Sequence, residues 1–208
     1  TRMVDLVRLL TNRNIYILFT EYESLDHNRP LFPQRCLLSS ASLRVLSEQA
    51  IIRDADAQQL SILWDRLDNS PNAPIVRLAF SRWSVTSERL SDEDKLIDYW
   101  IALESLFTPD ASQEVTYRSA IRIAAFLGDA AEVRKKIYDD IRHSYEWRSA
   151  LVHGGRRESG RIKKLRKNVP LRSIADNTRS YLREAIIRIL RSDECFNPTN
   201  IEHELLGR

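Results

Sequence analysis

From about residue 54 onward, apolar side chains recur every three or four positions along the chain. This spacing places them on one face of an α-helix. Residues that typically start or stop helices separate the apolar stretches, among them Ser91, Gly128 and the adjacent Gly154 and Gly155. The pattern therefore predicts six helices, at about 54–67, 75–90, 92–107, 115–127, 130–153 and 171–191.

The apolar faces of these helices predict the core of a mainly α-helical, antiparallel bundle. The apolar face of the first helix consists of Leu60, Leu63, Trp64 and Leu67. The face of the second helix consists of Ile75, Leu78, Ala79, Arg82 and Trp83, and that of the third consists of Leu96, Trp100, Leu103 and Phe107. The face of the fifth helix consists of Val133, Ile137, Ile141, Tyr145 and Val152, and that of the sixth consists of Ile174, Tyr181, Leu182, Ala185, Ile189 and Leu190. All four tryptophans of the chain are expected in this core.

The chain before residue 53 lacks the helical periodicity. An apolar run at 15–19 is typical of a buried strand, and a second candidate strand lies near 35–39, after Pro30 and Pro33. This organisation gives three segments: a β-containing lead-in or the tail of an upstream domain at 1–52, a helical domain at 53–192 and a C-terminal tail at 193–208.

The composition excludes several classes of protein. With 208 residues, 43% of them hydrophobic, the chain suits one globular domain with a small appendage, or two small domains. No apolar stretch approaches the roughly 18 residues that a membrane span needs. Cys36 and Cys195 are far apart and in no ligand spacing, so neither a disulfide framework nor a zinc site is expected. We expect a cytoplasmic protein and, because the chain begins at Thr1 without an initiator methionine, one portion of a longer protein.

The formal net charge of +3 hides an asymmetry between the two halves of the chain. Residues 1–107 carry 12 Lys and Arg against 15 Asp and Glu, whereas residues 108–208 carry 20 against 14. We therefore expect the second half to meet an anionic partner. A basic run follows the fifth helix, and its candidate phosphate-binding residues are Arg156, Arg157, Arg161, Lys163 and Lys164. A solvated basic loop is the simpler alternative for the same run.

The fifth helix breaks its own pattern at Arg148. Its apolar stripe runs through Ile137, Ile141 and Tyr145, and the position that should continue the stripe is charged. An unpaired guanidinium on a buried face would be costly, so Arg148 has an acidic partner, faces a cleft or meets a bound anion. Glu104, which borders the apolar stripe of the third helix, is the candidate partner.

His153 follows Arg148 by five positions, just before the paired glycines. Five steps along an ideal helix amount to roughly 140° of rotation, so the two side chains would not share a face. Two arrangements would still bring them together. Either the last turn unwinds at Gly154, or two copies of the chain combine their halves across a dimer interface.

Three stretches of the helical region together resemble one known family. They are LIDYWIALESLF at 96–107, RSAIRIAAFLG at 118–128 and YEWRSALVHGG at 145–155. Over about 54–191 the chain is similar to the HEPN superfamily and, within it, to the Apea-like group. The marker of this family is an Arg followed a few residues later by a His, which here would be Arg148 and His153. Active members often have Asn, Asp or His after that Arg, whereas this chain has Ser149.

The resemblance implies a fold, a reaction and partners. Similar HEPN proteins are helical bundles, usually homodimers, and many are endoribonucleases that need no metal ion or other cofactor. The 2′-hydroxyl of RNA attacks the adjacent phosphate, His153 would transfer protons, Arg148 would stabilise charge on the phosphoryl oxygens, and Ser149 would orient either group. Glu104 and Tyr145 would be structural or would line the cleft. The family also implies an effector in a toxin or antiphage defence system, with a sensor or antitoxin partner.

Two other functional classes stay open. A non-catalytic HEPN module could dimerise and bind nucleic acid or a partner protein, with Arg148 and Glu104 as a structural pair. A histidine near the C-terminus of a helix, such as His153, is also a common capping group. By family analogy, the domain could instead recruit substrate for a nucleotidyltransferase.

Overall fold

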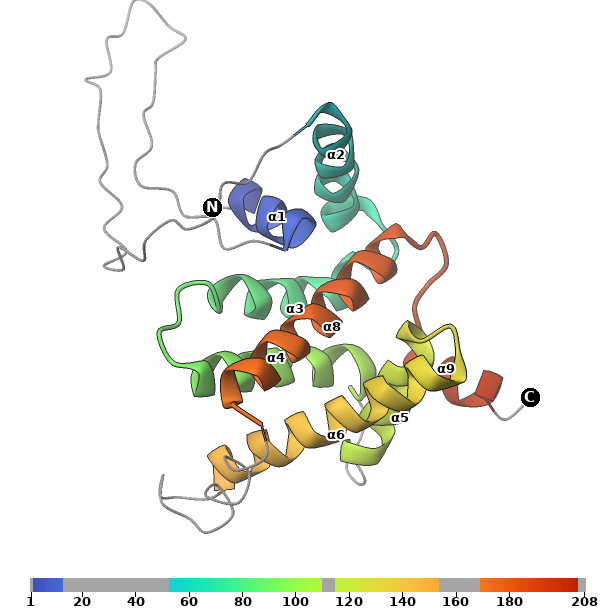
Figure 1. The fold of residues 1–208 in the computed structure, drawn as a ribbon. Helices are drawn as coiled ribbons and strands as arrows, with labels where there is room; N and C mark the ends of the chain where they lie inside the picture. Colours follow the sequence, from blue (N-terminus) through green and yellow to red (C-terminus); the bar gives the residue numbers. More distant parts are fainter. Residues whose placement is uncertain (1, 13–52, 110–114, 154–168, 206–208) are drawn as a thin grey trace, which may run out of the picture. The chain divides into compact units, whose positions relative to one another are not determined.

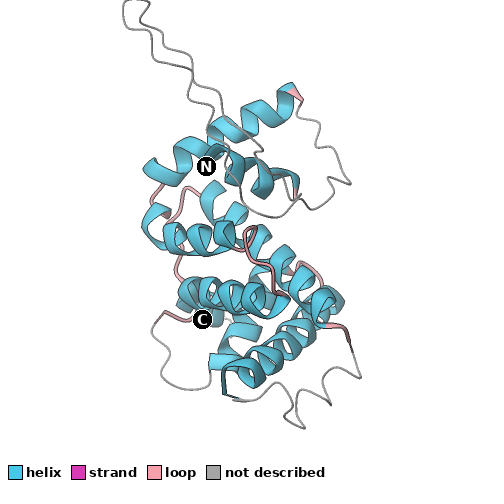
Figure 2. Cartoon of the chain, turned by 90° about the vertical axis from the view of Figure 1, so that its left-hand side faces the viewer, coloured by secondary structure: helices cyan, strands magenta, loops and turns pink. Residues whose placement is uncertain are grey.

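The computed structural model describes residues 2–12, 53–109, 115–153 and 169–205, and these residues form eight α-helices and no strand (Figure 1, Figure 2). The helices are α1 (Arg2–Thr11), α2 (Asp54–Asn69), α3 (Ala73–Val85), α4 (Asp92–Phe107), α5 (Val115–Leu127), α6 (Ala131–His153), α8 (Leu171–Arg191) and α9 (Pro198–Leu205). Within this described part of the chain, no helix is long and apolar enough to cross a membrane. The prediction of a mainly α-helical protein is confirmed.

The first described residues form a helix, α1, in a stretch where the sequence showed no helical periodicity. In α1 the fully buried Leu6 and Leu9 lie three positions apart, and Arg8 forms an ion pair with Asp5 at 2.8 Å. A spacing of three brings side chains together on a helix, whereas a strand needs a spacing of two. Outside the described residues lie both predicted strands, at 15–19 and 35–39.

The chain divides into two compact units, Thr1–Leu60 and Ser61–Arg208, with the boundary inside α2. The larger unit contains Arg148 and Glu104. In this unit α8 packs against α3, α4, α5 and α6 (Figure 1). α5 packs against α4, α6 and α9 as well. The candidate site therefore lies within one packed set of helices.

Short-range signals start and stop these helices as expected. Ser91 is the N-cap of α4, and its hydroxyl accepts a hydrogen bond of 3.3 Å from the backbone N–H of Asp94. α5 ends just before Gly128, where the chain passes close to the start of α6. A Cβ on Gly128 would lie 2.6 Å from Cγ of Arg134 and 2.9 Å from the carbonyl oxygen of Ala124. Because both distances are too short for non-bonded atoms, a glycine is required at this turn.

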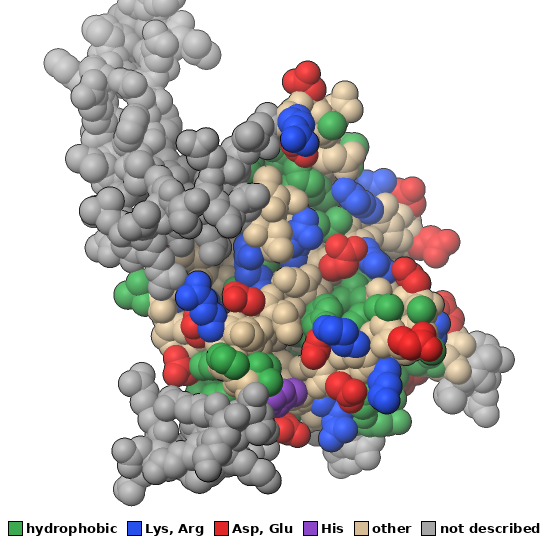
Figure 3. Space-filling model, viewed as in Figure 1, with side chains coloured by type: hydrophobic (Ala, Val, Ile, Leu, Met, Phe, Trp, Pro, Cys, Tyr) green, Lys and Arg blue, Asp and Glu red, His purple; other side chains and the backbone are tan. Residues whose placement is uncertain are grey.

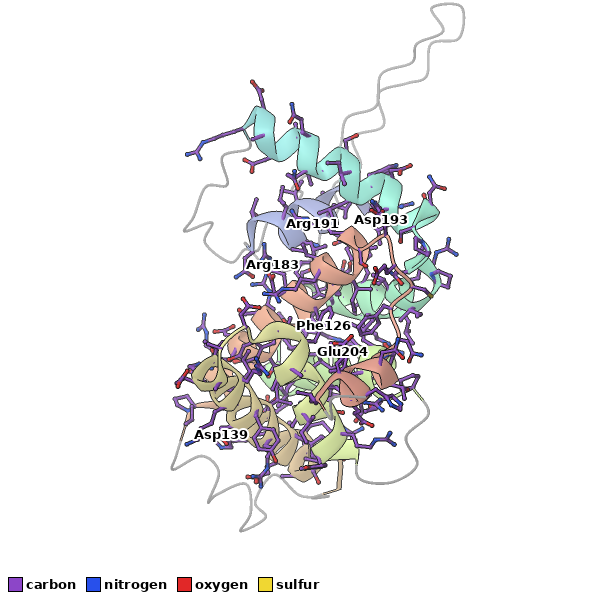
Figure 4. All side chains as sticks on the ribbon, turned by 90° about the vertical axis from the view of Figure 1, so that its right-hand side faces the viewer. Phe126, Asp139, Arg183, Arg191, Asp193 and Glu204 are labelled. Atoms are coloured by element: carbon purple, nitrogen blue, oxygen red, sulfur yellow. The ribbon has the colours of Figure 1, made fainter. Side chains whose placement is uncertain are left out.

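The core of the larger unit uses most of the predicted faces. The α4 stripe is completely buried, and its members are Leu96, Trp100, Leu103 and Phe107. Three aromatic rings extend this core toward the C-terminal segment. The rings of Phe107, Phe126 and Phe196 pack edge to face, with centroids 5.2 to 5.7 Å apart, and Phe126 is labelled in Figure 4.

Four side chains that the periodicity assigned to the core are 40 to 49% exposed, which corrects the prediction: Trp64, Leu78, Val133 and Val152. In α3 the buried face runs instead through Val76 and Phe80, so it is rotated away from Leu78. In α6 the fully buried Trp147 replaces Val152 as the last large core residue. The spacing of apolar residues identifies a helix, but packing against neighbouring helices selects the face that becomes buried.

The segment after α8, predicted as a C-terminal tail, is held on the larger unit and contains α9. The side-chain amide of Asn72 donates to the carbonyl oxygens of Ile189 and Glu194, both at 2.9 Å, and its oxygen accepts from the N–H of Phe196 at 2.7 Å. Glu202 of α9 then pairs with two arginines of α5. Because α9 has eight residues and few apolar positions, periodicity did not reveal it.

Candidate active site around Arg148

Arg148 lies at the margin of the buried face of α6. This face includes Ile141, Ser144 and Trp147, none of which is more than 1% exposed. The side chain of Arg148 is 20% exposed, so its guanidinium is neither fully buried nor free in solvent. The charged residue that interrupts the apolar stripe thus lies where the core meets the surface.

Glu104 of α4 is the acidic partner of Arg148. Nη2 of Arg148 lies 3.3 Å from Oε1 of Glu104 and donates a hydrogen bond of the same length to Oε2. Burial raises the pKa of the Glu104 carboxyl, and the nearby Arg148 guanidinium lowers it, with a net rise above the ordinary value. The attraction of Arg148 therefore does not fully offset the cost of burying this carboxylate.

The rest of the Arg148 guanidinium has weaker contacts. Its central carbon lies 5.5 Å from the centre of the Tyr145 ring, which in turn packs edge-on against Trp100 with centroids 5.0 Å apart. Nε of Arg148 is buried, and no hydrogen-bond acceptor for it occurs among the described residues. Buried N–H groups in proteins are nearly always hydrogen-bonded, so this N–H group is an exception. It is a donor that can still accept a partner from outside the described residues.

Arg122 of α5, in the same unit, is a more deeply buried arginine with an acidic partner. Its side chain is only 4% exposed. Its Nε donates to Oε1 of Glu202 at 2.8 Å, and its Nη1 donates to the carbonyl oxygen of Phe107. Each arginine reaches its carboxylate through one nitrogen, but Arg148 is more exposed and its distance of 3.3 Å is longer. Arg148 is therefore the less firmly held of the two arginines.

A buried chain of hydroxyl groups fixes α6 relative to α4 and α8. Nε1 of Trp100 donates to the hydroxyl of Ser144 at 2.8 Å, and this hydroxyl lies 2.7 Å from that of Thr178. The Thr178 hydroxyl donates to the carbonyl oxygen of Ile174 at 2.7 Å, which leaves it to accept from Ser144. Sequence reasoning missed this network, although Ser144, a polar residue on a buried helix face, was a usable signal.

His153 is the last residue of α6, and the helix is continuous up to it. Unwinding of the last turn before Gly154, one of the two arrangements that the sequence left open, is therefore not observed. Five steps along a continuous helix place positions 148 and 153 roughly 140° apart around its axis. The other arrangement, a site shared between two copies of the chain, stays a prediction.

The structure brings together three of the residues that the sequence singled out: Glu104, Tyr145 and Arg148. Ser149 follows Arg148 directly and is partly buried. The side chain of His153 lies outside the described residues. So does the basic run with Arg156, Arg157, Arg161, Lys163 and Lys164. The roles expected of His153 and of the basic run stay predictions.

The surface adds one feature that the sequence did not single out. On the face shown in Figure 3, acidic and basic side chains are interspersed rather than separated by sign. On α8, however, Arg183 is close enough to Arg179 and Arg191 for their charges to act on it, and Arg183 and Arg191 are labelled in Figure 4. Burial lowers the pKa of Arg183, and the charges of Arg179 and Arg191 lower it further, while Glu184 opposes them. This group contributes to the positive charge of the second half of the chain.

Comparison with known family models gave no match, and no similarity to curated proteins or to solved structures was found. The candidate site is therefore defined by Arg148, an arginine between α4 and α6 that pairs with Glu104 through one nitrogen and has a buried Nε without an acceptor among the described residues.

Proposed function

We propose that this chain is a metal-independent endoribonuclease in which Arg148 and His153 act on one phosphodiester of RNA. The 2′-hydroxyl attacks the adjacent phosphorus, the bond from phosphorus to the 5′-oxygen of the next nucleotide breaks, and a cyclic phosphate end remains. His153 accepts the proton of the attacking hydroxyl or protonates the leaving 5′-oxygen. Arg148 stabilises the negative charge that develops on the non-bridging oxygens, and Ser149 orients the phosphate or the histidine.

The observation that carries the proposal is the incomplete pairing of Arg148. A guanidinium recognises phosphate best when two of its N–H groups donate side by side to two oxygens. Arg148 donates to Glu104 through Nη2, and its buried Nε has no acceptor among the described residues. A bound phosphodiester supplies the acceptor that this donor lacks.

The proposal of a site shared by two copies rests on where positions 148 and 153 lie around the axis of α6. Positions 148 and 153 are on different sides of this continuous helix, so Arg148 of one copy would face His153 of the other. Val152, beside His153, is 47% exposed and offers an apolar side chain for a second copy to cover. The proposal therefore includes a homodimer formed through the helices of the larger unit.

RNA is the expected partner of this dimer. The basic run at 156–164 would attract the phosphate backbone before the RNA reaches the site. The resemblance to HEPN proteins supports a role as an effector in a toxin or antiphage defence system. A sensor or antitoxin partner would then control the cleavage of cellular RNA.

One observation favours a second candidate, a non-catalytic HEPN module that dimerises and binds nucleic acid or a partner protein. Arg148 already has an acidic partner, Glu104, within its own chain, as a structural pair would. Ser149 also stands where active members of the family often have Asn, Asp or His. This candidate predicts RNA or partner binding without cleavage.

Incubation of the purified chain with end-labelled RNAs in EDTA tests the reaction. We expect cleavage in EDTA, cyclic phosphate at the product ends, and a rate loss of roughly 10²- to 10⁴-fold for His153→Ala, the range for removing a general acid or base. Arg148→Ala should lose roughly 10²- to 10³-fold. Arg142→Ala and His143→Ala, which change the same residue types on α6, should stay active. RNA binding without cleavage by the native chain would favour the non-catalytic module.

Subunit mixing tests the shared site. Arg148→Ala and His153→Ala chains, each inactive alone, are unfolded together and refolded. If each site takes its arginine and its histidine from different copies, about half of the dimers are mixed, and about a quarter of the native activity returns. No recovery of activity would contradict a site built from one arginine and one histidine of different copies.

A further inference from the structure

Glu104 holds the one nitrogen of Arg148 that every two-pronged anion contact uses. A guanidinium can grip two oxygens side-on, through Nε and Nη2, or end-on, through Nη1 and Nη2. Both arrangements include Nη2, and both oxygens of Glu104 lie 3.3 Å from it. Nη2 carries two N–H groups, so a phosphodiester in either arrangement would share this nitrogen with Glu104. The two negative charges repel each other there, and the phosphodiester therefore competes with Glu104.

We propose that Glu104 is a displaceable counter-ion of Arg148, which holds the guanidinium in the free protein and yields its place to an RNA phosphodiester. The identity of the phosphodiester rests on the proposed function. The new element is the role of Glu104 as a positioning residue that occupies the anion site when the site is empty. In the alternative, Glu104 is a permanent structural partner and leaves Arg148 unable to bind phosphate.

The length of the contact supports displacement. Charge-assisted N–H to carboxylate bonds are ordinarily about 2.7 to 2.9 Å long. The pair of Arg122 and Glu202 has such a bond, at 2.8 Å, whereas Arg148 and Glu104 are 3.3 Å apart. The pair at the candidate site is thus longer than the pair of Arg122 and Glu202.

Solvation favours the same conclusion. The side chain of Glu104 is 25% exposed, so a small rotation returns its carboxylate to water. Burial keeps the pKa of this carboxyl above its ordinary value despite Arg148, which is the only charged group that acts on it among the described residues. Displacement relieves that burial, and the incoming phosphate gives the buried Nε of Arg148 an acceptor.

Titration of the full chain with dimethyl phosphate, a phosphodiester that cannot be cleaved by this route, tests the proposal. Binding is followed by the ¹⁵N signal of Arg148 Nε, which is assigned by its loss in Arg148→Ala. We expect Glu104→Gln to bind dimethyl phosphate roughly three- to tenfold more tightly than the native chain, as removal of one partly exposed opposite charge allows. Glu132→Gln, which removes the same charge at the exposed start of α6, should leave the affinity unchanged.

Equal or weaker binding by Glu104→Gln overturns the proposal, as does the absence of any response of the Arg148 signal in every variant. Thermal unfolding of Glu104→Gln shows whether a loss of binding reflects a loss of fold. This outcome is separate from that of the cleavage assay. Tighter binding without RNA cleavage would retain the role of Glu104 and reject the ribonuclease, whereas cleavage without tighter binding would do the reverse.

Discussion

Nε1 of Trp100 donates a hydrogen bond of 2.8 Å to the hydroxyl of Ser144, and neither residue is more than 1% exposed. This bond joins α4 to α6 one helical turn before Glu104 and Arg148 meet across the same two helices. The position of Arg148 beside Glu104 thus depends on a buried contact that involves neither residue.

Replacing Ser144 with alanine would leave the Trp100 N–H buried without its acceptor and would remove the donor to Thr178. We expect Ser144→Ala to lower the free energy of unfolding by about 1–3 kcal/mol, the cost of an unsatisfied buried polar group. Urea unfolding followed by tryptophan fluorescence measures this change. Ser180→Ala, which removes an exposed hydroxyl of α8, should change it by less than about 0.5 kcal/mol. Equal losses in both variants would show that the buried network contributes nothing specific.

Asn72 should control the order of the segment between α8 and α9. Its fully buried side chain binds the backbone of Ile189, Glu194 and Phe196. We expect Asn72→Ala to cost about 2–4 kcal/mol of stability, because several backbone groups lose their partner together. Hydrogen exchange should show the loss of protection first at the amide of Phe196. Unchanged exchange there would contradict the prediction, and Asn69→Ala, at an exposed contact, is the matched control.

The sequence predicts best where the physical cause is local. Ser91 and Gly128 mark helix ends through contacts with residues a few positions away. The same holds for the conflict at Arg148, where the cost of burying a charge on an apolar stripe is enough to predict an acidic partner. Glu104, on the border of another stripe, is that partner because helical spacing alone places it beside the core.

What the sequence did not predict depends on contacts between distant segments. Leu78 and Val133 have the spacing of buried residues, yet they are exposed because the neighbouring helices cover other faces of α3 and α6. Ser144 is in the core because Trp100 and Thr178, from two other helices, satisfy its hydroxyl. Periodicity within one helix contains no information about those partners.

The phenol of Tyr181 donates a hydrogen bond of 2.6 Å to Oδ2 of Asp140, which links α8 to α6. Burial, followed by this hydrogen bond, raises the pKa of Tyr181 to about 12. Because the folded state holds the proton more tightly than the unfolded chain, this group stabilises the fold fully below its ordinary pKa. That stability is lost as the pH rises through about 12.

We therefore expect Asp140→Asn to bring the pKa of Tyr181 closer to its ordinary value, because the charge and the strong acceptor are gone. The difference in ultraviolet tyrosinate absorbance between each chain and its Tyr181→Phe version isolates this phenol during an alkaline titration. Asp139→Asn changes the exposed neighbouring carboxylate, labelled in Figure 4, and should leave the titration in place. A Tyr181 titration unaffected by Asp140→Asn would show that burial alone sets its pKa.

Glu202 connects α9 to α5 through Arg118 at 3.1 Å and Arg122 at 2.8 Å. The hydrogen bond from Arg118, together with that from Arg122 and the charges of both, holds the pKa of the Glu202 carboxyl below its ordinary value, although burial opposes them. For a carboxyl with a lowered folded pKa, the stabilisation is present above the ordinary pKa. It is lost as the pH falls through the lowered, folded value.

Glu202→Gln should therefore destabilise the chain at neutral pH by about 1–3 kcal/mol, because Arg122, which is 4% exposed, loses its charged acceptor. The difference in unfolding free energy between native and variant chains should shrink as the pH falls, since the protonated Glu202 then resembles glutamine. Urea unfolding at a series of pH values below neutrality measures both effects. Glu204→Gln, on the exposed side of α9 (Figure 4), changes the net charge equally and should show neither. A difference that stays constant with pH would mean that Glu202 stabilises α9 by packing rather than by its charge.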